Sequence, residues 1–323
     1  MTVVLLRPLG LGDLLTAVPA MRAVAEAYPQ HRRLLAAPQA LAPLALAAGA
    51  VDEVVDTRPL QPLPDRLRGA DVAVDLHGRG PASHRVLLDA RPRRLIAFAN
   101  PEVPQTAGFP RWRDQEHEVV RWCRMLAGHG IAADPTRLDL QLPGPGPGEP
   151  AGAVIVHPGA AFEARRWPAR RFAAVARHLR LRGESVLITG SSSEIPLARE
   201  VASLAGLDAS AVAAGRTDLL GLARLVRGAR GVICGDTGIA HLATALRTPS
   251  VVLFGPTPPA LWGPPTGRPW HRTIWRGRRG DPHGRGPDPG LMDISVDAVI
   301  REWEELAQRV RRHARPRGSE TSG

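Results

Sequence analysis

The sequence predicts an α/β protein with two similar halves, each a parallel β-sheet flanked by crossover helices. Short apolar runs alternate with helical patterns along the chain, as they do in such sheets. The alternation stops at a segment of proline and glycine near residue 143 and then starts again. A length of 323 residues fits two domains better than one. Two halves joined by a hinge imply a cleft between them, and such clefts are preferred ligand sites.

The first half, residues 1–142, is expected to form a Rossmann-like domain. Its expected strands are residues 3–6, 34–37, 51–55, 72–76 and 95–98. Its expected helices are residues 14–27, 40–48 and 117–130. The last helix closes the domain, because its apolar residues gather on or near one face.

The second half repeats the pattern after a linker at residues 143–152, whose prolines and glycines can pack no core. We expect a second Rossmann-like domain over residues 153–314. Its expected strands are residues 154–156, 186–189, 231–234, 251–254 and 270–276, and its expected helices are residues 168–182, 195–204, 219–229 and 296–312. Residues 277–290 are expected to be a mobile loop and residues 315–323 a disordered tail.

The net charge of +11 is carried by arginine, since the chain has no lysine. It favours anionic partners such as nucleotide diphosphates, acidic acceptors or a lipid surface. Nucleic acid is disfavoured, because the arginines are dispersed and aromatic residues make up only 4% of the chain. With no long apolar run and no signal peptide pattern, we expect a cytoplasmic protein that could associate with the inner face of the membrane without spanning it. Cys123 and Cys234 are expected to be buried thiols.

The most informative motif follows the strand expected at residues 231–234. Asp236 and Thr237 can cap the next helix, and Gly238 lets a ligand approach the backbone. The unpaired amides at a helix N-terminus can donate hydrogen bonds to a diphosphate. His241 lies about one turn into the helix and faces the same side as Thr237. Because ligands of open α/β sheets sit at the carboxyl ends of strands, a nucleotide-linked molecule is the expected ligand.

A Gly-x-Gly turn that ends at Gly12 opens the first helix and resembles half of a dinucleotide fingerprint. Leu15 replaces the third glycine, and no acidic residue follows at the usual spacing, so an NAD site is disfavoured. Asp13 lies in the first turn. It can cap the helix or face the cleft as a base.

Three further segments of the second half join strands to helices. His157 ends the first strand. Arg165 and Arg166 stand near a helix N-terminus, an unfavourable place for cations unless an anion joins them, and a solvated basic turn is the alternative. Pro168 fits the first helical position of that helix. Glu194 can cap a helix or bind ribose hydroxyls.

Asp75, His77 and Arg79 follow another strand of the first half and are candidate acceptor contacts. The sequence has no Asp-x-Asp pair and no cluster with convincing metal-ligand spacing. We therefore expect no metal and no cofactor, with arginines and helix termini stabilising a diphosphate leaving group.

Five segments together resemble glycosyltransferase family 9, the heptosyltransferases, in order over the chain to about Gly263. They are the loop at Gly12-Asp13, the strand end at His157, the run from Arg165 to Pro168, residues 190–194, and residues 235–241 with residues 254–257. The resemblance implies a GT-B fold, in which two Rossmann-like domains with parallel sheets face a central cleft. It also implies inverting, metal-independent transfer of heptose or a related sugar from an ADP-activated or other nucleotide donor. The acceptor hydroxyl would belong to a lipopolysaccharide core-like glycan, another cell-envelope glycan or a secondary metabolite. An NAD-linked oxidoreductase and a non-catalytic basic binding protein are the alternatives.

The resemblance also assigns roles to residues. Asp13 corresponds to the general base, and the segment with Asp236, Thr237, Gly238 and His241 to the site of the donor diphosphate and sugar. Glu194 corresponds to a nucleoside contact, and Gly12 and His157 belong to donor-side motifs. The family commonly has lysine two residues before Trp-Pro, where this chain has Arg165, so Arg165 or Arg166 would hold the phosphate.

Overall fold

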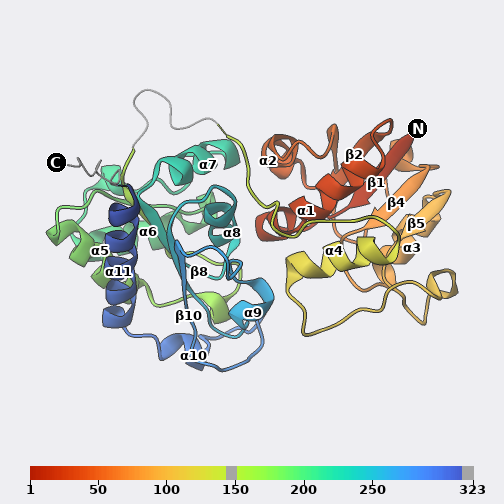
Figure 1. Ribbon diagram of the computed structural model, residues 1–323. Helices are drawn as coiled ribbons and strands as arrows, with labels where there is room; N and C mark the ends of the chain where they lie inside the picture. The colour runs from red at the N-terminus through yellow and green to blue at the C-terminus, as the bar shows by residue number, and fades with distance from the viewer. Residues whose placement is uncertain (143–150, 315–323) are drawn as a thin grey trace, which may run out of the picture. The chain divides into compact units, whose positions relative to one another are not determined.

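The computed structural model describes residues 1–142 and 151–314, which form two compact α/β units (Figure 1). One unit is built mostly from residues 1–142 and the other mostly from residues 151–314. Each contains a parallel five-stranded sheet, which confirms the predicted fold class. Most of the predicted linker and all of the predicted tail lie outside the described residues, and the predicted domain boundaries stay predictions.

The N-terminal unit has the strand order β3-β2-β1-β4-β5. Its strands are β1 (Thr2–Leu6), β2 (Arg32–Ala37), β3 (Glu53–Asp56), β4 (Val72–Asp75) and β5 (Arg94–Ile96). Each expected strand lies within two residues of the observed bounds. The central strand β1 is buried from Val3 to Leu6, as expected for a parallel strand with both faces covered.

The helices of this unit are α1 (Leu11–Ala27), α2 (Ala42–Ala47), α3 (Ala82–Asp89) and α4 (Glu118–Gly128). Helix α1 begins three residues earlier than expected. Its N-cap is Gly10, whose N–H donates to the Asp13 carboxylate at 3.1 Å, so the side chain in the first turn fixes the start of the helix. Helix α4 packs against α1.

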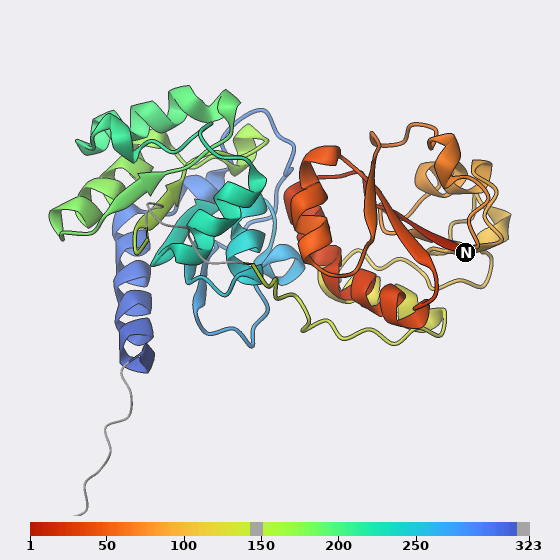
Figure 2. The same cartoon turned by 90° about the horizontal axis from the view of Figure 1, so that it is seen from above.

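The C-terminal unit has the strand order β10-β9-β8-β6-β7. Its strands are β6 (Val154–His157), β7 (Val186–Ile188), β8 (Gly231–Gly235), β9 (Ser250–Leu253) and β10 (His271–Ile274). The helices that follow β6 along the chain are α5 (Ala169–Leu181), α6 (Ile195–Ala205), α7 (Leu219–Gly228), α8 (Gly238–Ala245), α9 (Pro259–Trp262), α10 (Pro289–Met292) and α11 (Val296–Ala314). Helix α5 packs against both α6 and α11, and α11 runs along the outside of the unit (Figures 1 and 2).

Trp167 anchors the start of α5. Its ring is 2% exposed and meets Phe172 edge-on at 5.0 Å, and its Nε1 donates to the carbonyl of Ile294 at 3.1 Å. Helix α5 begins at Ala169, so Pro168 is its N-cap and not the first helical residue that the sequence predicted. Cys123 and Cys234 are buried free thiols, as predicted. No helix in residues 1–142 or 151–314 is long and apolar enough to cross a membrane.

Both sheets reverse their strand order beside the first strand of the unit. In the N-terminal unit β1 pairs with β2 on one side and with β4 on the other, and in the C-terminal unit β6 pairs with β7 and with β8. Ligands of open parallel sheets bind outside the carboxyl ends of strands at such points. Ligand-binding residues are therefore expected in the loops after β1 and β4, and after β6 and β8.

Candidate active site

The carboxyl ends of β6 and β8 lie side by side in the C-terminal unit. His157, the last residue of β6, is in register with Cys234, so the loop after β6 and the turn after β8 begin at the same edge of the sheet. Gly235 completes β8, and a Cβ atom there would lie 3.0 Å from the carbonyl oxygen of Arg165. The Arg165 loop therefore passes close over the end of β8, where Asp236 and Thr237 follow.

Helix α8 begins at Gly238 with Thr237 as its N-cap, but the Thr237 side chain makes no capping hydrogen bond. The capping role that the sequence suggested for Thr237 is thus absent. The amides of the first turn lack a cap from this side chain, and such amides bind anions. His241 lies about one turn into α8 and is half-buried.

Asp236 is buried beside this helix start. Burial raises the pKa of its carboxyl to about 6, and the nearby Arg165 guanidinium acts in the opposite direction. Arg165 is half-buried, and its Cζ lies 5.3 Å from the ring centre of Phe162. The buried Nε of Arg165 has no hydrogen-bond partner among the described residues. Arg165 thus combines a positive charge near Asp236 with an unused donor.

Arg166 is arranged differently from its neighbour. Its side chain is exposed, and its Nε donates to the carbonyl of Ala160 in the same loop at 2.8 Å. This contact ties the loop to itself. Of the two arginines, Arg165 is the one placed beside Asp236.

Glu194 closes a short 3-10 turn, Ser192–Glu194, after β7. Its Oε2 accepts hydrogen bonds from the backbone N–H of Ser191 at 2.7 Å and from the Ser191 hydroxyl at 2.9 Å. A Cβ atom at Gly159 would lie only 2.0 Å from Glu194 Oε1. The carboxylate therefore rests on the backbone of the loop after β6.

His157 is buried at the same sheet edge, with its Nδ1 3.0 Å from the hydroxyl oxygen of Thr189. Burial lowers the pKa of its imidazole, although the Glu194 carboxylate acts in the opposite direction. A lowered pKa favours the neutral ring at pH 7, so His157 supplies a hydrogen-bonding group rather than a positive charge.

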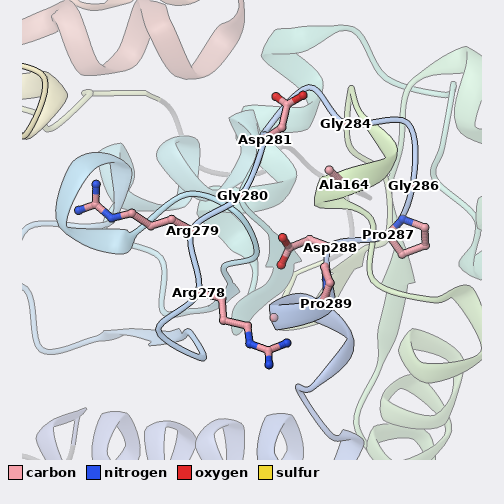
Figure 3. Close-up of a pocket in the computed structure, with 11 residues that line it drawn as sticks. Ala164, Arg278, Arg279, Gly280, Asp281, Gly284, Gly286, Pro287, Asp288 and Pro289 are labelled. Atoms are coloured by element: carbon pink, nitrogen blue, oxygen red, sulfur yellow. The ribbon is translucent and has the colours of Figure 1, made fainter.

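A cavity of about 480 Å³ lies next to the Arg165 loop and is formed by the loop between β10 and α10 (Figure 3). Ala164 lines it from one side, and the Asp288 carboxylate caps α10 by accepting from the Leu291 N–H at 3.0 Å. Arg278 and Arg279 point in different directions in Figure 3. None of the donor-site residues predicted from the sequence lines this cavity.

In the N-terminal unit, Asp13 follows β1 in the first turn of α1, next to Gly12. Its Oδ2 caps the helix through Gly10, its Oδ1 lies 3.5 Å from Arg7 Nη2, and 29% of the side chain is exposed. The capping role that the sequence suggested is therefore present, and the role of Asp13 as a base facing a cleft stays a prediction.

Arg7, directly after β1, is 1% exposed. Its Nη2 donates to Glu118 Oε1 at 3.0 Å and its Nε donates to the carbonyl of Asp13 at 3.0 Å. Glu118 also accepts from Trp122 Nε1 at 2.9 Å and pairs with Arg121. A buried network of hydrogen bonds and ion pairs thus lies next to Asp13, although the Nε of Arg121 has no hydrogen-bond partner among the described residues.

Of the three acceptor candidates, Asp75 is completely buried, and burial raises the pKa of its carboxyl to about 6. It accepts from the backbone N–H of His77 at 2.8 Å and so shapes the loop after β4. His77 is half-buried, and Arg79 is exposed. Burial lowers the pKa of His77, with Arg7 acting in the same direction. Contact with an acceptor stays a prediction for all three residues.

Comparisons with known proteins agree with this arrangement. Residues 115–275 match glycosyltransferase family 9 (heptosyltransferase). The chain belongs to glycosyltransferase family 9. Lipopolysaccharide heptosyltransferase 1 of Pseudomonas aeruginosa is 39% identical over 124 residues, which are 38% of this chain and 34% of that relative. Other curated heptosyltransferases match over 45% of their own length, so the matched segments span less than half of these relatives.

Solved family 9 structures share the fold. The match to the structure of E. coli ADP-heptose lps heptosyltransferase II spans 96% of the present chain and 100% of the E. coli chain. The TM-score is 0.77 and the sequence identity is 22%. E. coli heptosyltransferase WaaC with ADP covers 95% of this chain and 100% of that chain, with a TM-score of 0.69 and 19% identity. The two parallel sheets are therefore those of the GT-B fold of these heptosyltransferases.

Sequence reasoning assigned no role in this family 9 site to Arg7 or Glu118. Two weak signals were present: a charged residue directly after the buried strand β1, and a carboxylate in the first turn of α4, three residues before Arg121. The two side chains are 111 residues apart in sequence, and no local pattern pairs them. In the described parts of this family 9 chain, no three histidine, cysteine or carboxylate side chains gather as a metal site would require.

Proposed function

We propose that this chain is an inverting, metal-independent glycosyltransferase that moves a heptose or related sugar from an ADP-activated donor to an acceptor hydroxyl. The observation that best supports this proposal is the arrangement of residues at the end of β8 in this family 9 chain. There the first turn of α8 lacks a cap from Thr237, and Arg165 with its unpaired Nε lies near Asp236. This is the chemistry that a sugar diphosphate requires.

In this proposal the donor diphosphate lies at the N-terminus of α8. Amides of the first turn and the Arg165 guanidinium stabilise the charge that develops on the leaving diphosphate. Thr237, Gly238 and His241 contact the diphosphate and sugar. Arg165 is preferred to Arg166 as the phosphate ligand, because the Arg166 Nε is used by Ala160.

Glu194 binds the nucleoside in this proposal. Its Oε2 accepts hydrogen bonds from Ser191, and its Oε1 lies over the backbone of Gly159. A ribose hydroxyl is a suitable donor to such a carboxylate oxygen. His157 holds the same sheet edge through Thr189.

Asp13 is the proposed general base. It takes the proton from the acceptor hydroxyl as that oxygen attacks the anomeric carbon on the face opposite the diphosphate. A single displacement of this kind inverts the configuration. Asp13 suits the role because its carboxylate is partly exposed while its backbone position is fixed by the helix it caps.

The acceptor proposal rests on the names of the relatives. They are lipopolysaccharide and lipooligosaccharide heptosyltransferases, which favours a lipopolysaccharide core-like glycan over another envelope glycan or a secondary metabolite. The ADP donor is favoured by the structure of E. coli heptosyltransferase WaaC with ADP. An acceptor of this class would place the protein in the cytoplasm at the inner face of the membrane.

Isothermal titration calorimetry with ADP, UDP, GDP and their sugars tests the donor. We expect ADP and ADP-heptose to bind most tightly, and transfer to an acceptor glycan to proceed in buffer that contains a metal chelator. Tight binding of NAD with no binding of any sugar nucleotide would instead favour an oxidoreductase.

A further inference from the structure

Two carboxylates compete for one buried guanidinium behind Asp13. Nη2 of Arg7 lies 3.0 Å from Glu118 Oε1 and 3.5 Å from Asp13 Oδ1. The closer carboxylate is also the buried one, since the Glu118 side chain is 5% exposed and the Asp13 side chain 29% exposed. Charges interact more strongly at short range and away from water, so Arg7 is paired mainly with Glu118.

Glu118 is held so that it cannot swing away from Arg7. Its Oε1 accepts from Trp122 Nε1 at 2.9 Å as well as from Arg7, and its Oε2 pairs with Arg121. The Arg7 guanidinium lies over the Trp122 ring, with Cζ 4.8 Å from the ring centre. Its Nη1 donates to the carbonyl of Leu76. The guanidinium is therefore fixed on several sides.

Asp13 retains one firm contact and one loose one. Its Oδ2 accepts from the Gly10 N–H at 3.1 Å, while its Oδ1 keeps the longer contact with Arg7. The charged or titratable groups that face it are Arg7 from the end of β1, His77 from the loop after β4, and Glu118 from α4 by way of Arg7. A carboxylate locked in a full ion pair with arginine is a weaker base, because taking up a proton breaks the pair.

We propose that Glu118 is a positioning residue that occupies the Arg7 guanidinium and so keeps Asp13 out of a tight ion pair. The inference rests on the proposed function, in which Asp13 accepts the proton of the acceptor hydroxyl. Glu118 touches no substrate in this scheme. Glu118 affects the reaction only by pairing with Arg7, which would otherwise pair with Asp13.

Glu118→Gln in the full-length protein tests the proposal. Without the competing charge, Arg7 closes on Asp13, and the titration of the Asp13 carboxyl moves down by about one pH unit. Carbon-13 NMR measures this titration, with the signal assigned by comparison with Asp13→Asn. At neutral pH we expect kcat to fall about tenfold, with KM for the donor within about twofold of the parent value.

Arg7→Met should shift the Asp13 titration in the opposite direction. It removes the cation beside Asp13 but leaves the Glu118–Arg121 pair in place, so the Asp13 titration moves up. This variant also decides the question if Glu118→Gln does not fold. Glu116→Gln is the matched control, because the Glu116 side chain pairs with Arg124. The substitution keeps the backbone carbonyl of residue 116 that accepts from Arg121, so the Asp13 titration should not change.

The outcomes separate this inference from the proposed function. Unchanged Asp13 titration in both variants overturns the pairing, whatever the activity. Shifted titration with unchanged kcat overturns the positioning role. If the titrations shift as expected but the parent protein transfers sugar from no nucleotide donor, the pairing stands and the proposed function fails.

Discussion

The carboxylate of Glu194 lies directly against the backbone of Gly159. A Cβ atom at position 159 would come within 2.0 Å of Oε1. The contact joins the turn after β7 to the loop after β6. It makes the absence of a side chain at Gly159 a requirement for the position of the carboxylate.

Gly159→Ala should therefore displace Glu194 and weaken binding of ADP. A lost hydrogen bond to a charged group costs about 1.5–3 kcal/mol, so we expect a dissociation constant higher by about tenfold to a hundredfold. Calorimetry measures this constant. Gly267→Ala is the control, because a Cβ atom at position 267 meets no atom within 4 Å. The affinity of this variant for ADP should equal that of the parent. Equal affinities in the two variants would remove Glu194 from the donor site.

Asp13→Asn should abolish base catalysis while keeping the shape of the side chain. We expect kcat to fall at least about a hundredfold, which is typical for loss of a general base, and the affinity for ADP to remain within about threefold. Steady-state kinetics and calorimetry measure the two effects. A non-catalytic binding protein would show no activity to lose, and a large loss of ADP affinity would move Asp13 to the donor site.

Arg165→Met and Arg166→Met form a matched pair of neighbouring substitutions. Arg165 lies near Asp236 with an unpaired Nε, whereas the Nε of Arg166 bonds to Ala160. We expect the dissociation constant for ADP to rise about tenfold to a hundredfold in the first variant and less than about threefold in the second, since a charge-assisted hydrogen bond contributes about 1.5–3 kcal/mol. The reverse order would assign the phosphate to Arg166.

Asp236→Asn should change the pH dependence of stability. Burial raises the pKa of Asp236 to about 6, so the folded protein holds a proton that the unfolded chain has released between about pH 4 and pH 6. In that window the free energy of unfolding of the parent falls as pH rises, and the loss persists at higher pH. The variant avoids this loss and should be more stable than the parent at pH 7 by about 1–3 kcal/mol.

Urea unfolding at pH values from 4 to 8 measures this effect. Asp208→Asn is the control, because Asp208 is exposed in the same unit. The difference in free energy of unfolding between Asp236→Asn and the parent should grow from pH 4 to pH 7. The corresponding difference for Asp208→Asn should not change with pH. An advantage that does not grow would mean that Asp236 titrates as an ordinary carboxyl.

Most of the fold could be predicted from the sequence, because apolar strands in a parallel sheet have turn residues at both ends. β1 and β6 are examples, and both lie where the apolar runs predicted them. The short helices α9 and α10 were not predicted. Each is only four residues long and begins at a proline in a segment whose composition resembles a loop.

The candidate site was predictable where its chemistry is local. Asp236, Thr237 and Gly238 follow β8 directly, so a strand-to-helix turn could be inferred from neighbouring residues. Burial and long-range pairing were not predictable in the same way. Asp75 ends a strand like any polar residue, and only the tertiary structure shows that it is completely buried. The partner of Arg7 lies on a helix far along the chain.

The positive charge of Arg7 does not depend on pH in the range in which proteins work. A guanidinium keeps its proton throughout the range in which proteins work, whereas a buried lysine can lose its proton as its pKa falls. Because the cation next to Asp13 is an arginine, its positive charge stays constant across that range, whereas the neighbouring His77 can change its charge. A change in pH therefore alters the charges around Asp13 through neighbours such as His77, and not through the cation that follows β1.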